Sequence, residues 1–327
     1  MPPDLVTVVI VAYNNWPDVE LAVHSALCQS HREIEVIVVD NSSTDATAQD
    51  LPALFGDRIR YVRQANTRDS GAYNTGMRLA RGDFVQFLDG DDVLAPYKVE
   101  KQLAAFAADP GADVIFGDVR TFHTLAGPVQ SCDSSPRDQD DMLHAFLARY
   151  GNLVIPMVGM LFRRSALEKV GTFDETLYCS DVDYELRALW AGCRFRFSAG
   201  SPVAFYRVRP GQMSCDRHAM ALSQEAIWKK AAAYMTREPY ASLARGNAAW
   251  AAYMLALRRN GLGTGEALSK LREARAMCPK TIPPLAYVSG IAVILTPWRS
   301  VLLDSPLLRG ARRAVATIAG CRPYWST

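Results

Sequence analysis

Short apolar runs alternate with stretches of helical periodicity along the first part of the chain. Val6–Ala12 is apolar except for one Thr, the pattern of a strand buried on both faces. Apolar residues recur at helical spacing from Val19 to Leu27, and Ile34–Val39 predicts a second buried strand. This β-α-β alternation predicts an α/β fold in which helices flank a mostly parallel sheet.

The same alternation continues towards residue 116. Strands are predicted over Arg58–Arg63, Asp83–Leu88 and Asp113–Phe116, and helices over Gly71–Ala80 and Lys98–Ala108. These elements extend the expected parallel sheet and its flanking helices.

The polar segment Thr121–Asp141 predicts an exposed loop, and helical signals dominate after about Arg217. Helices are predicted over Gln224–Met235, Arg245–Arg259 and Gly265–Met277, the last two as a helical hairpin. We therefore expect one domain over residues 1–217 and a helical C-terminal region over residues 218–327.

The charge is balanced over the whole chain but uneven along it. Of the 36 basic and 34 acidic residues, 15 and 5 lie from His218 to Thr327, which leaves 21 and 29 before that point. The last third therefore has a net charge of +10 and the rest −8, an asymmetry that can mark an interaction segment. The near-zero total gives no reason to expect a nucleic-acid partner.

The seven cysteines are scattered and never spaced C-x-x-C. They match neither a zinc site nor a disulfide framework, so a reducing, cytoplasmic location is expected. No secretory signal is expected, because no basic residue precedes the first apolar run. The apolar run Leu285–Leu295 is too short to span a membrane, which takes about 20 residues.

Three carboxylates stand within four residues where the predicted strand Asp83–Leu88 ends: Asp89, Asp91 and Asp92. Carboxylates this close repel one another unless a proton or a cation compensates them. Oxygen ligands suit Mg²⁺ or Mn²⁺, which one or two carboxylates can hold together with phosphate oxygens. An acidic turn that caps the next helix is the alternative.

Two further acidic positions are candidates for chemistry. Asp40 ends another predicted strand, so it would lie on the same sheet edge as Asp89, where parallel α/β sheets bind ligands. Asp181 lies near the start of a predicted helix, where negative charge is favoured. Helix capping is the alternative for both. No glycine-rich dinucleotide motif follows either early strand, so dinucleotide binding is disfavoured.

Taken in order, these segments resemble glycosyltransferase family two, whose members have the GT-A fold. The resemblance covers about residues 5–215 and lies in Val6–Asn14, Glu35–Asp45, Asn66, Gly71–Gly76, Ala80–Asp83, Leu88–Asp92, Gly159–Arg164, Gly171–Glu175, Asp181–Arg187 and Tyr206–Ser214. It implies a Rossmann-like catalytic domain that transfers a sugar from a nucleotide-sugar, usually a UDP-sugar, with inversion at the anomeric carbon. The acceptor implied is a glycan or a lipid-linked glycan, in the synthesis of surface polysaccharide or cell-envelope glycans.

The resemblance also implies roles for single residues. Asp181 would be the general base that takes the proton of the acceptor hydroxyl. Asp91 and Asp89 would bind a divalent cation, Mn²⁺ or Mg²⁺, that balances the charge of the departing diphosphate. Asp40 would bind the uracil edge and Asp89 the ribose. The donor-binding residues implied are Ala12, Tyr13, Asn14, Asp40, Ser42, Asn66, Gly71, Asn74, Asp89, Gly90, Arg207 and Arg209.

Three positions depart from the family pattern. Ala12 stands where proline is common, and Ser180 stands where a Glu usually precedes the base, which keeps Asp183 as a rival base. Arg209 takes the place of a His that can complete the metal shell in many members. Arginine cannot ligate a metal but pairs well with diphosphate oxygens, so Arg207 and Arg209 are candidates to stand in partly for the cation.

Two other functions fit part of the pattern. Asp89 and Asp91 after a hydrophobic strand also match the first motif of haloacid dehalogenase-type phosphatases, but in that superfamily the motif opens the fold, whereas three predicted strands precede it here. A non-catalytic protein that binds a sugar or a partner would keep the fold without the activity. The retained acidic positions argue against it and favour the transferase.

The acceptor and the membrane are expected to involve the less regular parts of the chain. We expect Thr121–Gly151 and Pro156–Met160 to read the acceptor. The basic last third mixes apolar residues with arginines, namely Trp298, Leu302, Leu303, Leu307 and Leu308 with Arg299, Arg309, Arg312 and Arg313. Such a mixture fits peripheral contact with an anionic membrane surface on the cytoplasmic face. A helical cap packed on the catalytic domain is the alternative.

Overall fold

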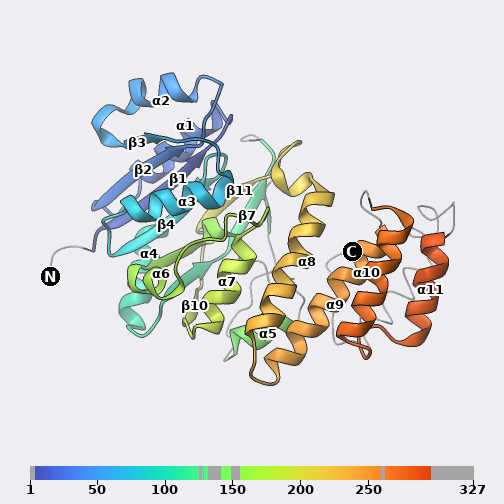
Figure 1. The fold of residues 1–327 in the computed structure, drawn as a ribbon. Coiled ribbons are helices and arrows are strands. Elements are labelled where there is room, and N and C mark those ends of the chain that lie inside the picture. Colours follow the sequence, from blue (N-terminus) through green and yellow to red (C-terminus); the bar gives the residue numbers. More distant parts are fainter. Residues whose placement is uncertain are drawn as a thin grey trace. The chain divides into compact units, whose positions relative to one another are not determined.

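The computed structural model describes residues 4–124, 127, 129–131, 141–148, 155–258 and 262–295 (Figure 1). The chain forms two compact units. The first consists of Met1–Asp138, Val154–Thr176 and Arg187–Pro210, and the second of Gln139–Leu153, Leu177–Leu186 and Gly211–Thr327. The second unit thus also takes in residues 177–186, which precede the domain boundary that the sequence predicts at residue 217.

The first unit is built on a seven-stranded sheet of order β10-β6-β9-β4-β1-β2-β3. Its strands are β1 (Val6–Ala12), β2 (Ile34–Asp40), β3 (Arg60–Arg63), β4 (Phe84–Asp89), β6 (Val114–Gly117), β9 (Met160–Arg163) and β10 (Phe195–Ser198). Every pairing is parallel except the two that β9 makes with β4 and β6. This confirms the predicted α/β fold with a mostly parallel sheet.

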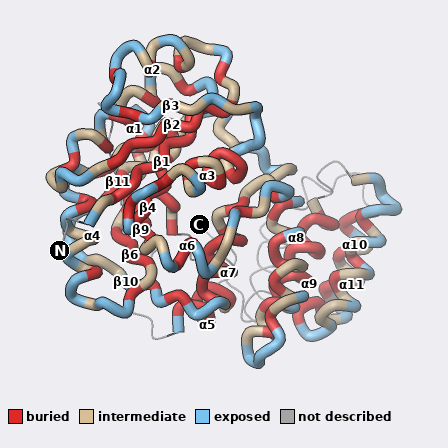
Figure 2. Tube along the Cα trace, turned by 60° about the vertical axis from the view of Figure 1, so that its left-hand side comes forward, coloured by how far each residue is buried: buried red, intermediate tan, exposed pale blue. Residues whose placement is uncertain are grey.

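Helices cover the sheet and bury its apolar strands. They are α1 (Asp18–Leu27), α2 (Thr47–Phe55), α3 (Arg68–Leu79), α4 (Lys98–Ala108) and α6 (Arg164–Val170). A further helix, α7 (Asp181–Trp190), crosses the division between the units. Val19 and Val23 of α1 belong to one apolar core with Ile10 of β1, and Val99 and Phe106 of α4 belong to another. Every residue of β1 is buried, and Figure 2 shows β1 and β2 as a buried centre.

In the first unit, two elements begin two or three residues away from their predicted starts. A 3₁₀ turn, Gly56–Arg58, occupies the start of the strand predicted from Arg58, so β3 begins at Arg60. The helix predicted from Gly71 begins at Arg68. Both differences concern element ends, where local hydrogen bonding rather than apolar periodicity decides.

The first unit has a second, four-stranded sheet of order β5-β11-β7-β8. Its strands are β5 (Val93–Leu94), β7 (Val119–Phe122), β8 (Gln130–Ser131) and β11 (Ala204–Arg207). The prediction of a loop over Thr121–Asp141 is therefore wrong at β7 and β8, and residues 132–140 lie outside the described residues. These strands are short, and β7 pairs with β11, which is remote in sequence, so no local alternation marks them.

Helices make up the second unit: α5 (Met142–Ala148), α8 (Arg217–Tyr234), α9 (Tyr240–Arg258), α10 (Thr264–Met277) and α11 (Pro284–Leu295). The three helices predicted after residue 217 are confirmed. The predicted hairpin partners α9 and α10 share a core that includes Trp250 and Leu271. Asp216 caps α8 by accepting from His218 N and Ala219 N.

Among the described residues, the longest helices are too short or too polar to cross a membrane. The mixed apolar and basic segment from Trp298 to Arg313, which carries the prediction of membrane contact, lies outside the described residues.

Candidate active site

The carboxyl ends of neighbouring strands carry several predicted donor-binding residues. In the parallel register, Ala12 at the end of β1 pairs with Asp40 of β2, and Val11 pairs with Asp89 of β4. Tyr13 follows β1 directly and exposes 48% of its surface. The structure thus brings Asp40 and Asp89 to one edge of the sheet, the position in which parallel α/β sheets bind ligands.

Asp40 is fully buried, and protein donors occupy both of its oxygens. Oδ1 accepts from Ser43 N at 2.8 Å, and Oδ2 accepts from Tyr61 Oη at 2.5 Å and Arg63 Nη1 at 3.1 Å. Burial, and then the contact with Asp40, raise the pKa of Tyr61 above its ordinary value. The sequence did not single out Tyr61 or Arg63; their signal is the register that sets Arg63 beside Asp40.

The loops after β1 and β2 are tied to each other. Asn14 N donates to Ser43 Oγ at 3.1 Å, and Asn14 Oδ1 accepts from Thr44 N at 2.7 Å. Asn14 and Ser42 have φ angles of 48° and 72°, in the left-handed region that residues with a Cβ rarely adopt. Such strain persists where the surroundings fix it, and it is common at binding loops.

Two predicted donor-binding asparagines hold protein segments in place. Asn74 is buried on α3; its Nδ2 donates to Phe173 O at 3.0 Å and to Glu175 Oε1 at 2.8 Å, and its Oδ1 accepts from Phe173 N at 2.8 Å. Asn66 Oδ1 accepts from Asn41 Nδ2 at 3.2 Å and from Arg68 N at 3.0 Å. The geometry therefore gives both asparagines a supporting position.

Two predicted donor-binding glycines allow close packing beside these segments. A Cβ at Gly71 would lie 2.1 Å from Thr67 Oγ1, and a Cβ at Gly90 would lie 2.2 Å from Asn15 Nδ2. Neither distance leaves room for a side chain. Gly90 therefore allows the acidic turn after β4 to pack against Asn15.

The acidic turn places its three carboxylates in different surroundings. Asp89 Oδ1 accepts a hydrogen bond from Tyr73 Oη. Asp92 is buried, and its Oδ1 accepts from Arg207 N at 2.8 Å. Its Oδ2 has no hydrogen-bond partner among the described residues. Burial, followed by repulsion from Asp89 and Asp91, raises the pKa of Asp92 well above its ordinary value.

Two arginines at the end of β11 contact the acidic turn. Arg209 Nε donates to Asp91 Oδ2 at 2.7 Å. Arg207 Nε donates to Asp91 O at 3.0 Å, and Arg207 Nη2 lies 3.2 Å from Asp18 Oδ1. The Arg207 guanidinium also lies 4.6 Å from the ring centre of Phe122. The structure therefore brings the predicted residues Asp91, Arg207 and Arg209 together.

The described residues contain no group of three or more His, Cys, Asp or Glu side chains that could hold a metal ion alone. The acidic turn nevertheless fits a hard cation that takes one or two carboxylates and completes its shell with phosphate oxygens and water. Asp91 is partly exposed, and Asp89 and Asp92 lie within two residues of it on the same turn. The residues present therefore fit a divalent cation bound together with a diphosphate.

Asp181 is the first residue of α7, which confirms its predicted place at a helix start. Its Oδ1 accepts from Cys179 Sγ and from Val182 N, each at 2.8 Å. Among the described residues no hydrogen bond reaches Asp181 Oδ2. The rival Asp183 is buried, and Lys230 Nζ lies 3.0 Å from its Oδ1. Of the two carboxylates, Asp181 is the more accessible.

One helical turn after Asp181, Glu185 exposes 2% of its surface, and its Oε2 has no hydrogen-bond partner in the described part of the chain. Burial, and then the charge of Asp181, raise the pKa of Glu185 well above its ordinary value. Burial and the neighbouring Asp181 thus favour the protonated form of Glu185 over its ionised form.

The chain is similar in sequence to known glycosyltransferases. The model of glycosyl transferase family 2 matches residues 7–171. An uncharacterized glycosyltransferase of Nostoc sp. is 32% identical over 180 residues, which cover 52% of this chain and 54% of that protein. The UDP-Glc:alpha-D-GlcNAc-diphosphoundecaprenol beta-1,3-glucosyltransferase WfaP of Escherichia coli is 25% identical over 232 residues, 69% of this chain and 86% of that protein.

Among solved structures, S. aureus TarS 1-349 in complex with UDP-GlcNAc has a TM-score of 0.65 at 17% identity, covering 91% of this chain and 92% of that one. This likeness shows a shared fold. The chain spans 54% to 61% of the length of the curated relatives that it matches first.

Proposed function

This chain belongs to glycosyl transferase family 2, and we propose that it transfers a sugar from a UDP-sugar to a hydroxyl group of a lipid-linked glycan, with inversion at the anomeric carbon. The observation that carries the proposal is the sheet edge at which Asp40 and Asp89 flank β1. Arg207 and Arg209 meet the acidic turn that follows Asp89. The family and this geometry together favour synthesis of a surface or cell-envelope polysaccharide.

The proposed site for the nucleoside is the pair of loops after β1 and β2. The exposed ring of Tyr13 offers an apolar face to a base, and the tie between Asn14 and Thr44 fixes the loops around it. Asp40 holds the loop after β2 and strand β3 beside this site, since its oxygens accept hydrogen bonds from Ser43 N, Tyr61 and Arg63. UDP is proposed because WfaP is named for UDP-Glc and the TarS complex contains UDP-GlcNAc.

The proposed site for the diphosphate is the acidic turn with its arginines. Arg209 and Arg207 supply guanidinium groups that can pair with phosphate oxygens. Asp91, with Asp89, would hold Mn²⁺ or Mg²⁺ there, and the cation would balance the charge that develops on the departing diphosphate. Asp92 Oδ1 accepts from Arg207 N and so holds the end of β11 beside the turn.

Asp181 is the proposed general base. Cys179 and Val182 hold its Oδ1, while Oδ2 stays available to take the proton from the attacking hydroxyl. Asp183 is a weaker candidate because it is buried and Lys230 Nζ already lies against its carboxylate. Direct attack assisted by one base produces inversion in a single displacement.

The proposed acceptor is a glycan on a lipid diphosphate, since WfaP is named for an acceptor of that kind. Residues of Thr121–Gly151 and Pro156–Met160 remain the proposed acceptor-reading segments. Because a lipid acceptor lies in a membrane, we also propose that the basic C-terminal segment contacts the cytoplasmic face of that membrane peripherally.

A screen of nucleotide-sugars tests the proposed function. UDP-, GDP- and dTDP-sugars are incubated with the protein and Mn²⁺, and release of the nucleoside diphosphate is measured. We expect hydrolysis of a UDP-sugar, its loss in Asp91→Ala, and its loss in EDTA. Binding of a UDP-sugar with no turnover of any donor or acceptor would instead support a non-catalytic sugar-binding protein.

A further inference from the structure

The four-stranded sheet has one face in the core of the first unit and one face outside it. Side-by-side partners in neighbouring strands share a face, and successive residues alternate between faces. On the core face Ala204 pairs with Leu94 on one side and Val119 on the other, and all three belong to the main apolar core. One residue along, Phe205 pairs with Val93 and with Arg120, so these three residues lie on the opposite face.

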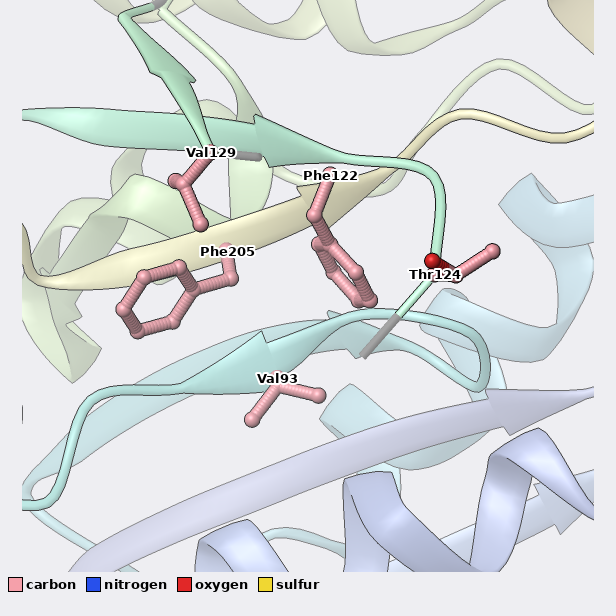
Figure 3. A pocket seen from close by; sticks show the side chains of 5 residues that line it. All are labelled: Val93, Phe122, Thr124, Val129 and Phe205. Atoms are coloured by element: carbon pink, nitrogen blue, oxygen red, sulfur yellow. The ribbon is translucent and has the colours of Figure 1, made fainter. Parts of the chain in front are cut away.

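That opposite face holds an apolar cavity of about 190 Å³. Figure 3 shows the side chains that line it: Val93, Phe122, Thr124, Val129 and Phe205. Val129 leaves 49% of its surface exposed, so the cavity has an apolar rim that water reaches. Apolar cavities of about 150 Å³ can bind a ligand the size of benzene. The space is therefore large enough for a branched chain segment of five carbons.

Two arginines flank this apolar surface on the same face of the sheet. Arg120 is half-buried beside Phe205, and in the described part of the chain its guanidinium has no hydrogen bond or ion pair. Arg207 lies two residues beyond Phe205 on β11, about 7 Å along the strand, and packs on Phe122. A guanidinium beside an apolar cavity is complementary to a molecule with an anionic head and an apolar chain.

We infer that this cavity, with Arg120, binds the lipid phosphate portion of the acceptor: the first branched segment of the lipid chain in the cavity and its phosphate at Arg120. The inference rests on the proposed transfer to a lipid-linked glycan. In such an acceptor a sugar and a diphosphate separate the attacking hydroxyl from the lipid. The cavity and Arg120 lie beside Phe205 on β11, two residues before Arg207, which contacts the acidic turn. This separation matches the place of the sugar and the diphosphate between the hydroxyl and the lipid.

Farnesyl diphosphate serves as the probe, titrated by calorimetry into the full chain with UDP at saturation, so that UDP occupies the proposed donor site. Inorganic diphosphate and farnesol test the head and the chain separately. The variants are Val129→Asp at the cavity rim and Arg120→Gln at the head. Leu54→Asp on α2 is the matched control, because Leu54 is 50% exposed and does not line the cavity.

We expect farnesyl diphosphate to bind more tightly than diphosphate or farnesol. Val129→Asp should raise its Kd about tenfold or more, because the new carboxylate meets the apolar chain and repels the phosphate. Arg120→Gln should raise the Kd for farnesyl diphosphate and leave that for farnesol unchanged. Leu54→Asp should leave both unchanged.

Equal affinity of wild type and Val129→Asp for farnesyl diphosphate would overturn the inference. A change of oligomeric state in Val129→Asp, measured by sedimentation, would also overturn it and assign the face to contact between copies. Failure of the proposed function has a different signature, since UDP-sugars would then neither bind nor turn over. Binding of farnesyl diphosphate that depends on Val129 would persist in that case.

Discussion

Arg209 Nε donates to Asp91 Oδ2 at 2.7 Å, so a permanent cation neutralises the carboxylate that is proposed to bind a metal ion. The guanidinium stays charged at every physiological pH. A divalent cation that binds Asp91 must therefore share or displace this ion pair. The arginine is then free to turn to the diphosphate, which links metal binding to donor binding at a single residue.

Arg209→Ala should separate the effect of Arg209 on metal binding at Asp91 from its effect on the diphosphate. Without the ion pair, Asp91 is free, and the Mn²⁺ concentration for half-maximal donor hydrolysis should fall about threefold to fivefold. The diphosphate loses a guanidinium partner as it departs, so kcat should fall about 10- to 100-fold. Steady-state hydrolysis of the UDP-sugar over a Mn²⁺ titration measures both quantities.

Arg209→Lys is the matched control, because it keeps the charge and loses the planar donor geometry. It should retain more turnover than the alanine variant. Unchanged turnover and unchanged Mn²⁺ dependence in Arg209→Ala would exclude both roles for this residue.

Asp181→Asn should abolish the proton acceptor without disturbing the donor site. Transfer to an acceptor should fall about 100-fold or more, while the Kd for UDP stays unchanged. Asp183→Asn is the comparison: it breaks the pair with Lys230 and should lower the free energy of unfolding by about 1–2 kcal/mol. If transfer collapses in Asp183→Asn and survives in Asp181→Asn, the two roles are reversed.

The sequence predicts those parts of the fold that have a strong local pattern. The apolar run Val6–Ala12 coincides with β1, and the predicted helix Lys98–Ala108 coincides with α4. Strands β7 and β8 cannot be predicted from local pattern. Strand β7 depends on pairing with β11, which is remote in the chain, and β8 depends on pairing with β7. Periodicity cannot reveal such a partner when each strand contributes four residues or fewer.

The same limit applies to the candidate site. Asp40 and Asp89 are predictable because each ends a recognisable strand. Tyr61 and Arg63, which bind Asp40, lie on a short, half-exposed strand whose register no motif encodes. Asn74 is recognisable by its motif, yet its bonds to Phe173 and Glu175 join segments about a hundred residues apart. Contacts over such separations come from the assembled fold.

Glu185→Gln should stabilise the protein, and more so at higher pH. The raised pKa means that the folded protein keeps a proton that the unfolded chain releases. The contribution of Glu185 to stability is therefore fully present below pH 4.5 and is lost as the pH rises towards its folded-state pKa. Glutamine resembles the protonated acid and does not titrate, so it should gain about 1–3 kcal/mol at pH 7.

Thermal unfolding of wild type and Glu185→Gln at pH 5 and pH 7 measures this difference. The gain in Tm should be larger at pH 7. A gain that is the same at both values would show that Glu185 has an ordinary pKa in the fold.

Lys98 on α4 is a buried base whose pKa is lowered, in contrast to Glu185, a buried acid whose pKa is raised. It is fully buried, and its Nζ donates to Gln86 Oε1, to Gln102 Oε1 and to Met160 O. The two glutamines continue the network by donating to the carbonyls of Val158 and Gly159. The Lys98 side chain thus helps to hold the turn before β9, part of the proposed acceptor-reading segment. Lys98→Met should lower the free energy of unfolding by about 2–4 kcal/mol, since it leaves three buried acceptors unpaired.

The pH dependence of that loss identifies the lysine as its cause. Burial lowers the pKa of Lys98 well below 10.5, so the unfolded chain binds a proton that the folded protein releases. The contribution of Lys98 to stability should therefore rise with pH between its folded-state pKa and 10.5, by up to about 1.4 kcal/mol per pH unit. Lys98→Met lacks this rise, so urea unfolding should show a larger difference at pH 9 than at pH 7. A difference that does not grow would mean that the three oxygens hold Lys98 fully protonated at both pH values.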